Sequence, residues 1–283
     1  MSNSAQVDFA AINEESTLVN GNTGSGGSFK VEPPVAGVAL LRLREVIEFG
    51  ENYSEKYEKT QSPVRLVFEL VHPRHAITKE DGTFIRNHEV TVNLPSKSFN
   101  EKAKYFKLFN KLNYDGAVAT PKGKVPAFNQ FLNKPFLGEI TLNENNGKVY
   151  ANLDKEGEFK IGAPKTPIID ETTGAPTGDF RDITVPEMAG TIRCFLWETG
   201  VTDAEYTAMW NSIEISGEKN DGTPFKNWIQ ESILSEDNIA LPGSRAEALF
   251  GKAAALDLSE PVDDIPFEAD APAAADPLAA LGL

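Results

Sequence analysis

The fold is decided by the stretch at residues 64–70, which reads VRLVFEL. Apolar side chains recur there at every second position from Val64 to Leu70, with Arg65 and Glu69 between them. This period of two predicts a β-strand that buries one face in a core.

The same pattern extends outward on both sides of this stretch. Upstream, residues 41–49 are largely apolar but place Arg42 and Arg44 at alternate positions. Downstream, an Asp-Gly turn at residues 81–82 leads to a further alternating segment at residues 90–94. Three strands are therefore predicted before residue 95.

A helix is predicted next. Residues 98–101 read SFNE, the pattern of a capping box, in which the Ser hydroxyl and the Glu carboxylate each bind a backbone amide. Apolar residues then follow at helical spacing. They are Tyr105, Leu108, Phe109 and Leu112.

Two more strands are predicted after the helix, over residues 140–142 and 149–153, joined by an Asn-Gly hairpin turn at residues 146–147. The order of three strands, a helix and two strands is that of a five-stranded OB-fold barrel. Such barrels bind oligonucleotides on one face and with the flanking loops.

The chain divides into three predicted parts. Residues 1–28 end in a Gly- and Ser-rich run and are expected to form a flexible arm. Residues 29–250 are expected to form the OB-fold domain, with a loop-rich insertion over 155–190 and an α/β extension packed on the barrel over 191–250. Residues 251–283, rich in Ala, Pro and Asp, are expected to form a disordered acidic tail. The predicted fold class is therefore mainly β.

The composition restricts the class of protein. A hydrophobic fraction of 40% and seventeen Phe exclude a wholly disordered chain. The single cysteine, Cys194, excludes an internal disulfide framework. The first residues carry no basic and apolar signal sequence, and no apolar run approaches the ~20 residues that span a bilayer. We expect a soluble cytoplasmic protein with no membrane partner.

Charge is distributed unevenly along the chain. The net charge is −15, yet residues 97–136 hold eight Lys against two acidic residues, together with eight aromatic residues. Lysines neutralise phosphates and aromatic rings stack on unpaired bases, so this combination favours single-stranded nucleic acid. The candidate DNA-binding residues in this segment are Lys102, Lys104, Phe106, Lys107, Lys111, Tyr114, Lys122, Lys124 and Phe128.

Each of these candidates has a simpler interpretation. The helical lysines also suit an ordinary solvated face, and the Phe residues suit the core, which is the favoured role for Phe109, Phe131 and Phe136. Three arginines on predicted strands, Arg42, Arg44 and Arg65, either line the binding face or are merely solvated.

No pattern for bond chemistry or a cofactor is found. His72, His75, His88 and Cys194 could be drawn as a zinc site, but their spacing matches no standard ligand pair. Phosphate-loop, zinc-protease and serine-hydrolase motifs are absent from the sequence. We therefore expect neither an enzyme nor a metal or cofactor.

Two segments resemble known families. The tail segment Asp263, Asp264, Ile265, Pro266 and Phe267 resembles the tail tip of bacterial single-stranded-DNA-binding proteins. Three further segments resemble the C-terminal half of a family of bacteriophage single-stranded-DNA-binding proteins. They are FLWE at 195–198, WNSI at 210–213 and KNWIQE at 226–231.

The resemblance implies a phage protein that coats and protects single-stranded DNA, without sequence preference, during replication, recombination or repair. It also implies that the tail recruits replication or recombination proteins. In the bacterial family that contact uses a terminal Phe carboxylate, whereas sixteen residues follow Phe267 here. The tail could instead compete with DNA for the lysines, or only add solubility.

Two other functions remain open. The alternative is a virion or assembly protein with no DNA-binding role, in which the β domain and tail pack against other subunits. The third hypothesis is a nuclease with an OB accessory domain, although no carboxylate cluster with metal-binding spacing supports it. The sequence is compatible with a monomer or a homo-oligomer.

Overall fold

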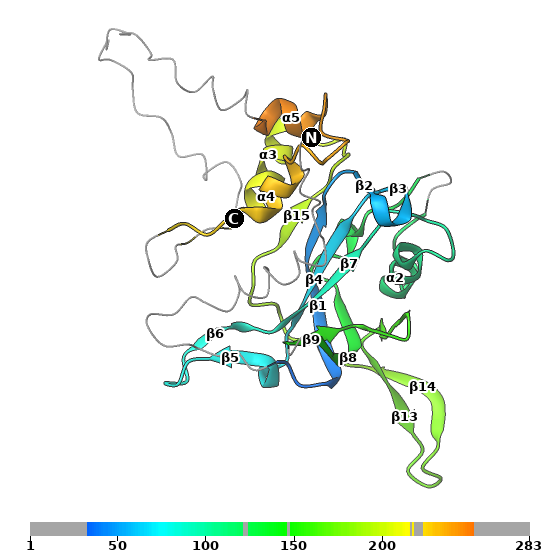
Figure 1. Ribbon diagram of the computed structural model, residues 1–283. Coiled ribbons are helices and arrows are strands. Elements are labelled where there is room, and N and C mark those ends of the chain that lie inside the picture. Colours follow the sequence, from blue (N-terminus) through cyan, green and yellow to red (C-terminus); the bar gives the residue numbers. More distant parts are fainter. Residues whose placement is uncertain (1–32, 121–123, 146–147, 216, 218–222, 252–283) are drawn as a thin grey trace, which may run out of the picture.

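The computed structural model describes residues 33–120, 124–145, 148–215, 217 and 223–251. This part of the chain is mainly β and is built around a barrel-like sheet (Figure 1). The five barrel strands are β1 (Gly37–Glu48), β4 (Val64–Leu70), β7 (Glu89–Leu94), β8 (Pro135–Asn145) and β9 (Lys148–Asn152).

The strands pair as an OB-fold barrel requires. Strand β1 pairs antiparallel with both β4 and β8, β4 pairs with β7, and β8 pairs with β9. Strand β9 lies against β7, which nearly closes the sheet. This confirms the predicted mainly-β class and the five-stranded barrel. The pairing of Asn145 with Lys148 also places a hairpin where Asn146-Gly147 predicts one, although residues 146–147 themselves lie outside the described residues.

Strand β1 contributes to two cores because both of its faces are covered, and a bulge sets which residues face each side. Leu43 pairs with Phe68 and Glu45 with Val67, so Arg44 is an extra residue in the ladder. Leu43 and the inward-facing residues of the other barrel strands fill the barrel interior. Ile47 instead faces a second core, which is formed with the C-terminal extension.

Helix α2 (Lys104–Leu112) packs on the barrel core through the four apolar residues predicted for it. The predicted capping box was wrong. The first helical residue is Lys104, its N-cap is Ala103, and no side chain caps the helix. The Asn100 side chain instead accepts a hydrogen bond from the Lys102 amide at 3.0 Å, because the chain makes a tight turn before the helix starts.

The stretch over 155–190 contains more structure than the predicted loops. Strands β10 (Asp154–Lys155), β11 (Glu158–Phe159) and β12 (Ile161–Gly162) are short, and β12 extends the sheet beside β8. Strands β13 (Lys165–Ile169) and β14 (Pro176–Asp182) form an arm that projects from the body (Figure 1). All seven residues of β14 are exposed.

Two smaller hairpins extend from the barrel ends. Strands β2 (Asn52–Ser54) and β3 (Lys59–Gln61) flank a 3-10 turn at Glu55–Tyr57. Strands β5 (Ala76–Thr78) and β6 (Phe84–Asn87) follow a 3-10 turn at Pro73–His75. A third 3-10 turn, Phe128–Phe131, precedes β8.

The C-terminal extension is α/β, as predicted, and packs on the outside of β1. Strand β15 (Arg193–Phe195) pairs parallel with β1. Helices α3 (Asp203–Ser212), α4 (Trp228–Ile233) and α5 (Arg245–Phe250) gather beyond it at one end of the barrel (Figure 1). Helix α5 was not predicted. None of the described helices is both long and apolar enough to cross a bilayer.

Candidate nucleic-acid interface

The outer face of β4 is covered. All seven β4 residues are buried, although only alternate ones point into the barrel. Outward-facing Glu69 accepts hydrogen bonds from the amides of Ala189 and Gly190, at 2.7 and 2.9 Å. OB-fold barrels bind oligonucleotides on the face of their second and third strands, and the second strand of this barrel, β4, is therefore covered on the side expected to bind DNA.

The three candidate arginines hold this cover in place. Arg65 is 4% exposed and donates to Glu45 at 2.8 Å, while its guanidinium lies over the Trp228 ring at 5.2 Å. Arg42, 8% exposed, donates to the carbonyls of Asn133, Val185 and Pro186.

Arg44 is also engaged within the fold. It pairs with Glu89 and donates to the Thr191 carbonyl at 3.0 Å. Burial lowers the pKa of this guanidinium from its ordinary value. The interpretation of Arg42, Arg44 and Arg65 as DNA-binding or solvated residues is therefore corrected: they are structural.

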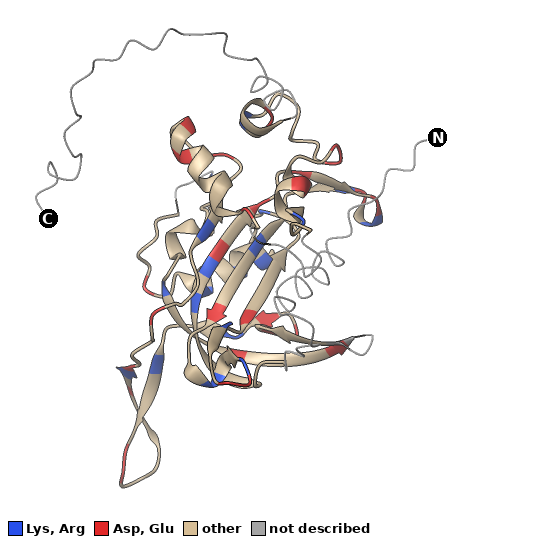
Figure 2. Cartoon of the chain, turned by 90° about the vertical axis from the view of Figure 1, so that its left-hand side faces the viewer, with Lys and Arg blue, Asp and Glu red and all other residues tan. Residues whose placement is uncertain are grey.

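Acidic and basic residues lie side by side along these strands (Figure 2). Glu45 lies at the centre of the network, since Arg193 of β15 also donates to it at 2.8 Å. Although burial alone would raise its pKa, the neighbouring charges of Arg65 and Arg193 hold the pKa of Glu45 below its ordinary value. Barrel and extension are thus joined by a buried ionic contact in which one carboxylate binds two guanidinium groups.

The lysines of α2 remain at the surface. Lys104, Lys107 and Lys111 are exposed on the helix face opposite the core, and Lys102 is exposed just before it. This row is partly balanced by carboxylates. Lys104 pairs with Asp154 at 3.2 Å. The pKa of Glu158 is lowered by Lys160, with smaller contributions from Lys111 and Lys107.

The aromatic candidates near α2 are less available. Phe128 is 0% exposed and packs between Tyr105 and Phe109, so it cannot stack on a base; that assignment is wrong. Phe106 is half-buried and packs edge-on against Phe99 at 4.9 Å.

Tyr114 is half-buried beneath Lys134, whose ammonium lies 4.2 Å from the ring centre. Phe109, Phe131 and Phe136 are fully buried, which confirms their predicted core role.

The remaining candidates fall at the edge of the described chain or beyond it. Lys124 is exposed. Lys122 and the tail residues Asp263, Asp264, Ile265, Pro266 and Phe267 lie outside the described residues.

The β2–β3 hairpin carries a surface that the sequence analysis missed. Tyr53 and Tyr57 are 55% and 57% exposed. The ammonium groups of Lys56 and Lys59 lie 5.4 and 5.6 Å from the Tyr57 ring centre. The signal that could have identified it is one lysine on each side of a tyrosine, Lys56 and Lys59 around Tyr57.

This hairpin connects the first two barrel strands, β1 and β4, and so occupies one of the two loops through which OB-fold barrels bind oligonucleotides. The Lys97 amide donates to the Ser62 carbonyl at 2.9 Å, which ties the base of the hairpin to the segment that leads into α2. The hairpin and α2 therefore leave the barrel from the same end.

The described residues offer neither a reactive thiol nor a cluster of metal ligands. Burial, and to a lesser degree Glu48, raise the pKa of the Cys194 thiol to about 12, so the reactive thiolate is disfavoured. No group of three or more His, Cys, Asp or Glu that could hold a metal ion occurs among the described residues.

No protein-family model matches this sequence, and a search of curated proteins finds no significant match.

Proposed function

We propose that this chain is a single-stranded-DNA-binding protein of the OB-fold type that coats and protects unpaired strands without sequence preference. The resemblance of residues 195–231 to the phage family supports a role in phage DNA replication, recombination or repair, which would be exerted in the host cytoplasm. In this proposal the protein is not an enzyme and requires no cofactor.

One observation carries the proposal. Two exposed segments with lysines, the β2–β3 hairpin and helix α2, leave the same end of a barrel-like sheet. The hairpin supplies rings for stacking on bases, Tyr53 and Tyr57, and lysines for phosphates. These are the elements that sequence-tolerant binding of single strands requires.

A titration of the purified protein tests this. Fluorescence anisotropy of a labelled thirty-nucleotide oligo-dT, a mixed-sequence single strand and a duplex of that sequence is measured at 50 and 200 mM NaCl. The two single strands are expected to bind similarly, and both at least about tenfold more tightly than the duplex. The log–log slope against salt should be near −0.7 per phosphate contacted. Equal affinity for duplex and single strand, or no binding at 50 mM NaCl, would refute the proposal.

The assembly alternative is favoured by a different observation, the β13–β14 arm. Ile168, Ile169 and Phe180 are exposed on it, Phe180 by 63%. Isolated two-stranded hairpins are only marginally stable, so such an arm suits contact with another molecule. Sedimentation of the protein alone and the oligo-dT titration together distinguish this role, because it requires a stable assembly without DNA and no binding of oligo-dT.

A further inference from the structure

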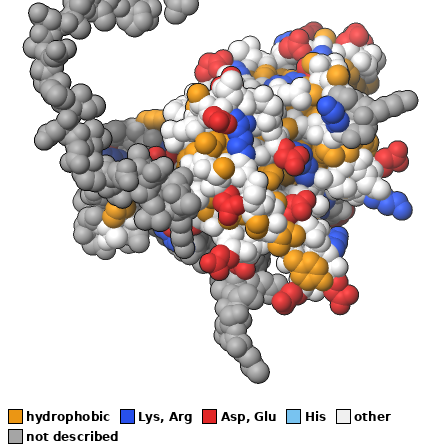
Figure 3. Space-filling view, turned by 90° about the horizontal axis from the view of Figure 1, so that it is seen from above, with side chains coloured by type: hydrophobic (Ala, Val, Ile, Leu, Met, Phe, Trp, Pro, Cys, Tyr) orange, Lys and Arg blue, Asp and Glu red, His pale blue; other side chains and the backbone are white. Residues whose placement is uncertain are grey.

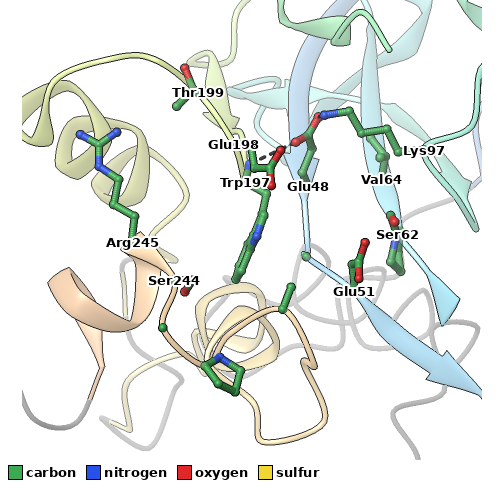
Figure 4. Close-up of a pocket in the computed structure, with 15 residues that line it drawn as sticks. Glu48, Glu51, Ser62, Val64, Lys97, Trp197, Glu198, Thr199, Ser244 and Arg245 are labelled. Atoms are coloured by element: carbon green, nitrogen blue, oxygen red, sulfur yellow. Dashed lines mark hydrogen bonds and ion pairs between the residues drawn. The ribbon is translucent and has the colours of Figure 1, made fainter. Parts of the chain in front are cut away.

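A cavity of about 580 Å³ opens between the barrel end and the C-terminal extension. The barrel side is formed by the end of β1 and by Ser62, Pro63 and Val64, where β3 leads into β4. The extension side is formed by residues 197–199, 240 and 242–245 (Figure 4). The volume is ample for a single heteroaromatic base.

Trp197 provides a fixed aromatic wall in this cavity. Its backbone amide donates to Glu48 at 3.1 Å, and its carbonyl accepts from the Tyr206 hydroxyl at 3.2 Å. The main chain is thus held from both sides, whereas the indole is only partly buried. Figure 4 shows the indole standing between the barrel residues and α5.

The charges around the cavity disfavour a phosphate inside it. Lys97 points to Glu48 and pairs with it at 2.7 Å (Figure 4). Arg245 points toward α3, where it pairs with Asp203 and lies over the Tyr206 ring at 4.5 Å. Both cations are therefore already neutralised.

The rim of the cavity adds negative charge. Glu51 and Glu198 line it and are exposed. Seen from this end of the molecule, acidic and basic side chains are interspersed, with no patch of one sign (Figure 3). An uncharged planar ring suits this lining better than an anion, and Ser62 and Thr199 add hydroxyl groups to the lining.

The cavity adjoins the candidate interface, because Ser62 directly follows β3 of the lysine-bearing hairpin. We propose that this cavity accepts one unpaired base of the bound strand, stacked on Trp197, while the hairpin lysines hold the neighbouring phosphates. This proposal rests on the proposed function and names one subsite of it.

The test compares the parent with Trp197→Ala, Trp197→Phe and Trp210→Phe. Trp210 stacks on Phe250 at 4.4 Å in the second core, away from the cavity, so its variant is the matched control for losing one tryptophan. Thermal unfolding first establishes that each variant is folded. The probes are oligo-dT of thirty nucleotides and an abasic oligonucleotide of the same length, which offers phosphates without bases.

Saturating oligo-dT is expected to quench the tryptophan fluorescence of the parent and of Trp210→Phe, and most of this quenching should disappear in Trp197→Phe. Trp197→Ala should bind oligo-dT about tenfold more weakly, as expected for one lost stacked base, but bind the abasic probe as the parent does. An equal loss for both probes, or unchanged quenching and affinity, would overturn the base subsite while leaving DNA binding intact. Failure of the parent to bind oligo-dT would overturn the proposed function and the subsite together.

Discussion

Glu45 shows how a single buried carboxylate joins two parts of this molecule. It is 3% exposed and bridges Arg65 of the barrel and Arg193 of the extension. A buried ion pair adds little net stability when complete, but removal of one partner leaves uncompensated charge. This asymmetry makes Glu45 a sensitive position.

Replacement of Glu45 by Gln is expected to lower the free energy of unfolding by about 3–5 kcal/mol, since two arginines then lack their counter-charge. Urea unfolding at pH 7 measures the change. Glu187→Gln is the control. Glu187 pairs with Arg42 but is largely exposed, so a loss below about 1 kcal/mol is expected. Similar losses in both variants would contradict the role given to burial.

The pH dependence of the Glu45 effect has a definite sign. Because the folded-state pKa of Glu45 is lowered, its contribution is present above the ordinary Glu pKa of about 4.3. The contribution is lost as the pH falls through the folded-state value. The difference between parent and Glu45→Gln should therefore narrow below about pH 4.

A second and separate loss of stability in acid is expected from His75. It is fully buried, and burial together with Arg74 lowers its pKa from 6.5 to about 4. Between these values the unfolded chain binds a proton that the folded chain does not, so acidification reduces stability. His75→Gln, which retains an acceptor for Arg74, should lose less stability than the parent between pH 6.5 and 4. His72→Gln, at an exposed position, should follow the parent; identical slopes in all three proteins would refute the assignment.

At the scale of elements, α2 presents the clearest prediction for DNA binding. Lys104→Glu, Lys107→Glu and Lys111→Glu together should weaken oligo-dT binding by at least about tenfold at 50 mM NaCl, because three phosphate contacts become repulsive. The loss should be independent of sequence and should shrink with added salt. Anisotropy titration provides the measurement.

The control for this triple variant places the same charge change elsewhere. Lys79, Lys165 and Lys226 are exposed outside α2 and the β2–β3 hairpin, and their replacement by Glu alters the net charge equally. The affinity of this control variant for oligo-dT is expected to change by less than about twofold. If both triple variants weaken binding alike, the effect is one of overall charge, and α2 is not the interface.

Element types were predictable where one face of an element meets the core. Strand β4 matches the alternation of VRLVFEL residue for residue, and the apolar stripe of α2 is buried as expected. Alternation cannot show that other segments also cover the outer face of a strand. Arg65 and Glu69 have the pattern of a solvated face. This face is buried by residues far along the chain: Trp228 lies against Arg65, and the amides of Ala189 and Gly190 bind Glu69.

The candidate site was less predictable, for a related reason. An aromatic residue such as Phe128 has the same composition signal whether it fills a core or stacks on a base, and only tertiary packing separates the two. The β2–β3 hairpin was missed because its three-residue strands are too short to show a period. The loops that flank a barrel are thus the part least visible to periodicity and the part most suited to binding.

For the whole molecule, the net charge of −15 opposes the approach of DNA, so the proposed binding depends on local lysines that act within a short range. The Debye length is about 8 Å at physiological salt, and acidic residues beyond it are largely screened. At low salt the same acidic residues are little screened, and they repel DNA over a longer distance. The repulsion of DNA by the acidic rest of the chain should therefore grow, relative to its attraction by the lysine-bearing end, as the ionic strength falls.

Deletion of residues 255–283 tests this balance. The deletion removes seven acidic residues and no basic one. Oligo-dT affinity is expected to be equal or higher at 200 mM NaCl and clearly higher at 25 mM, where screening is weak. A full-length variant with those seven residues changed to Asn or Gln is the control for chain length and should behave like the deletion. Weaker binding by either variant would show that the acidic segment assists the interface, because loss of its negative charge alone can only favour the approach of DNA.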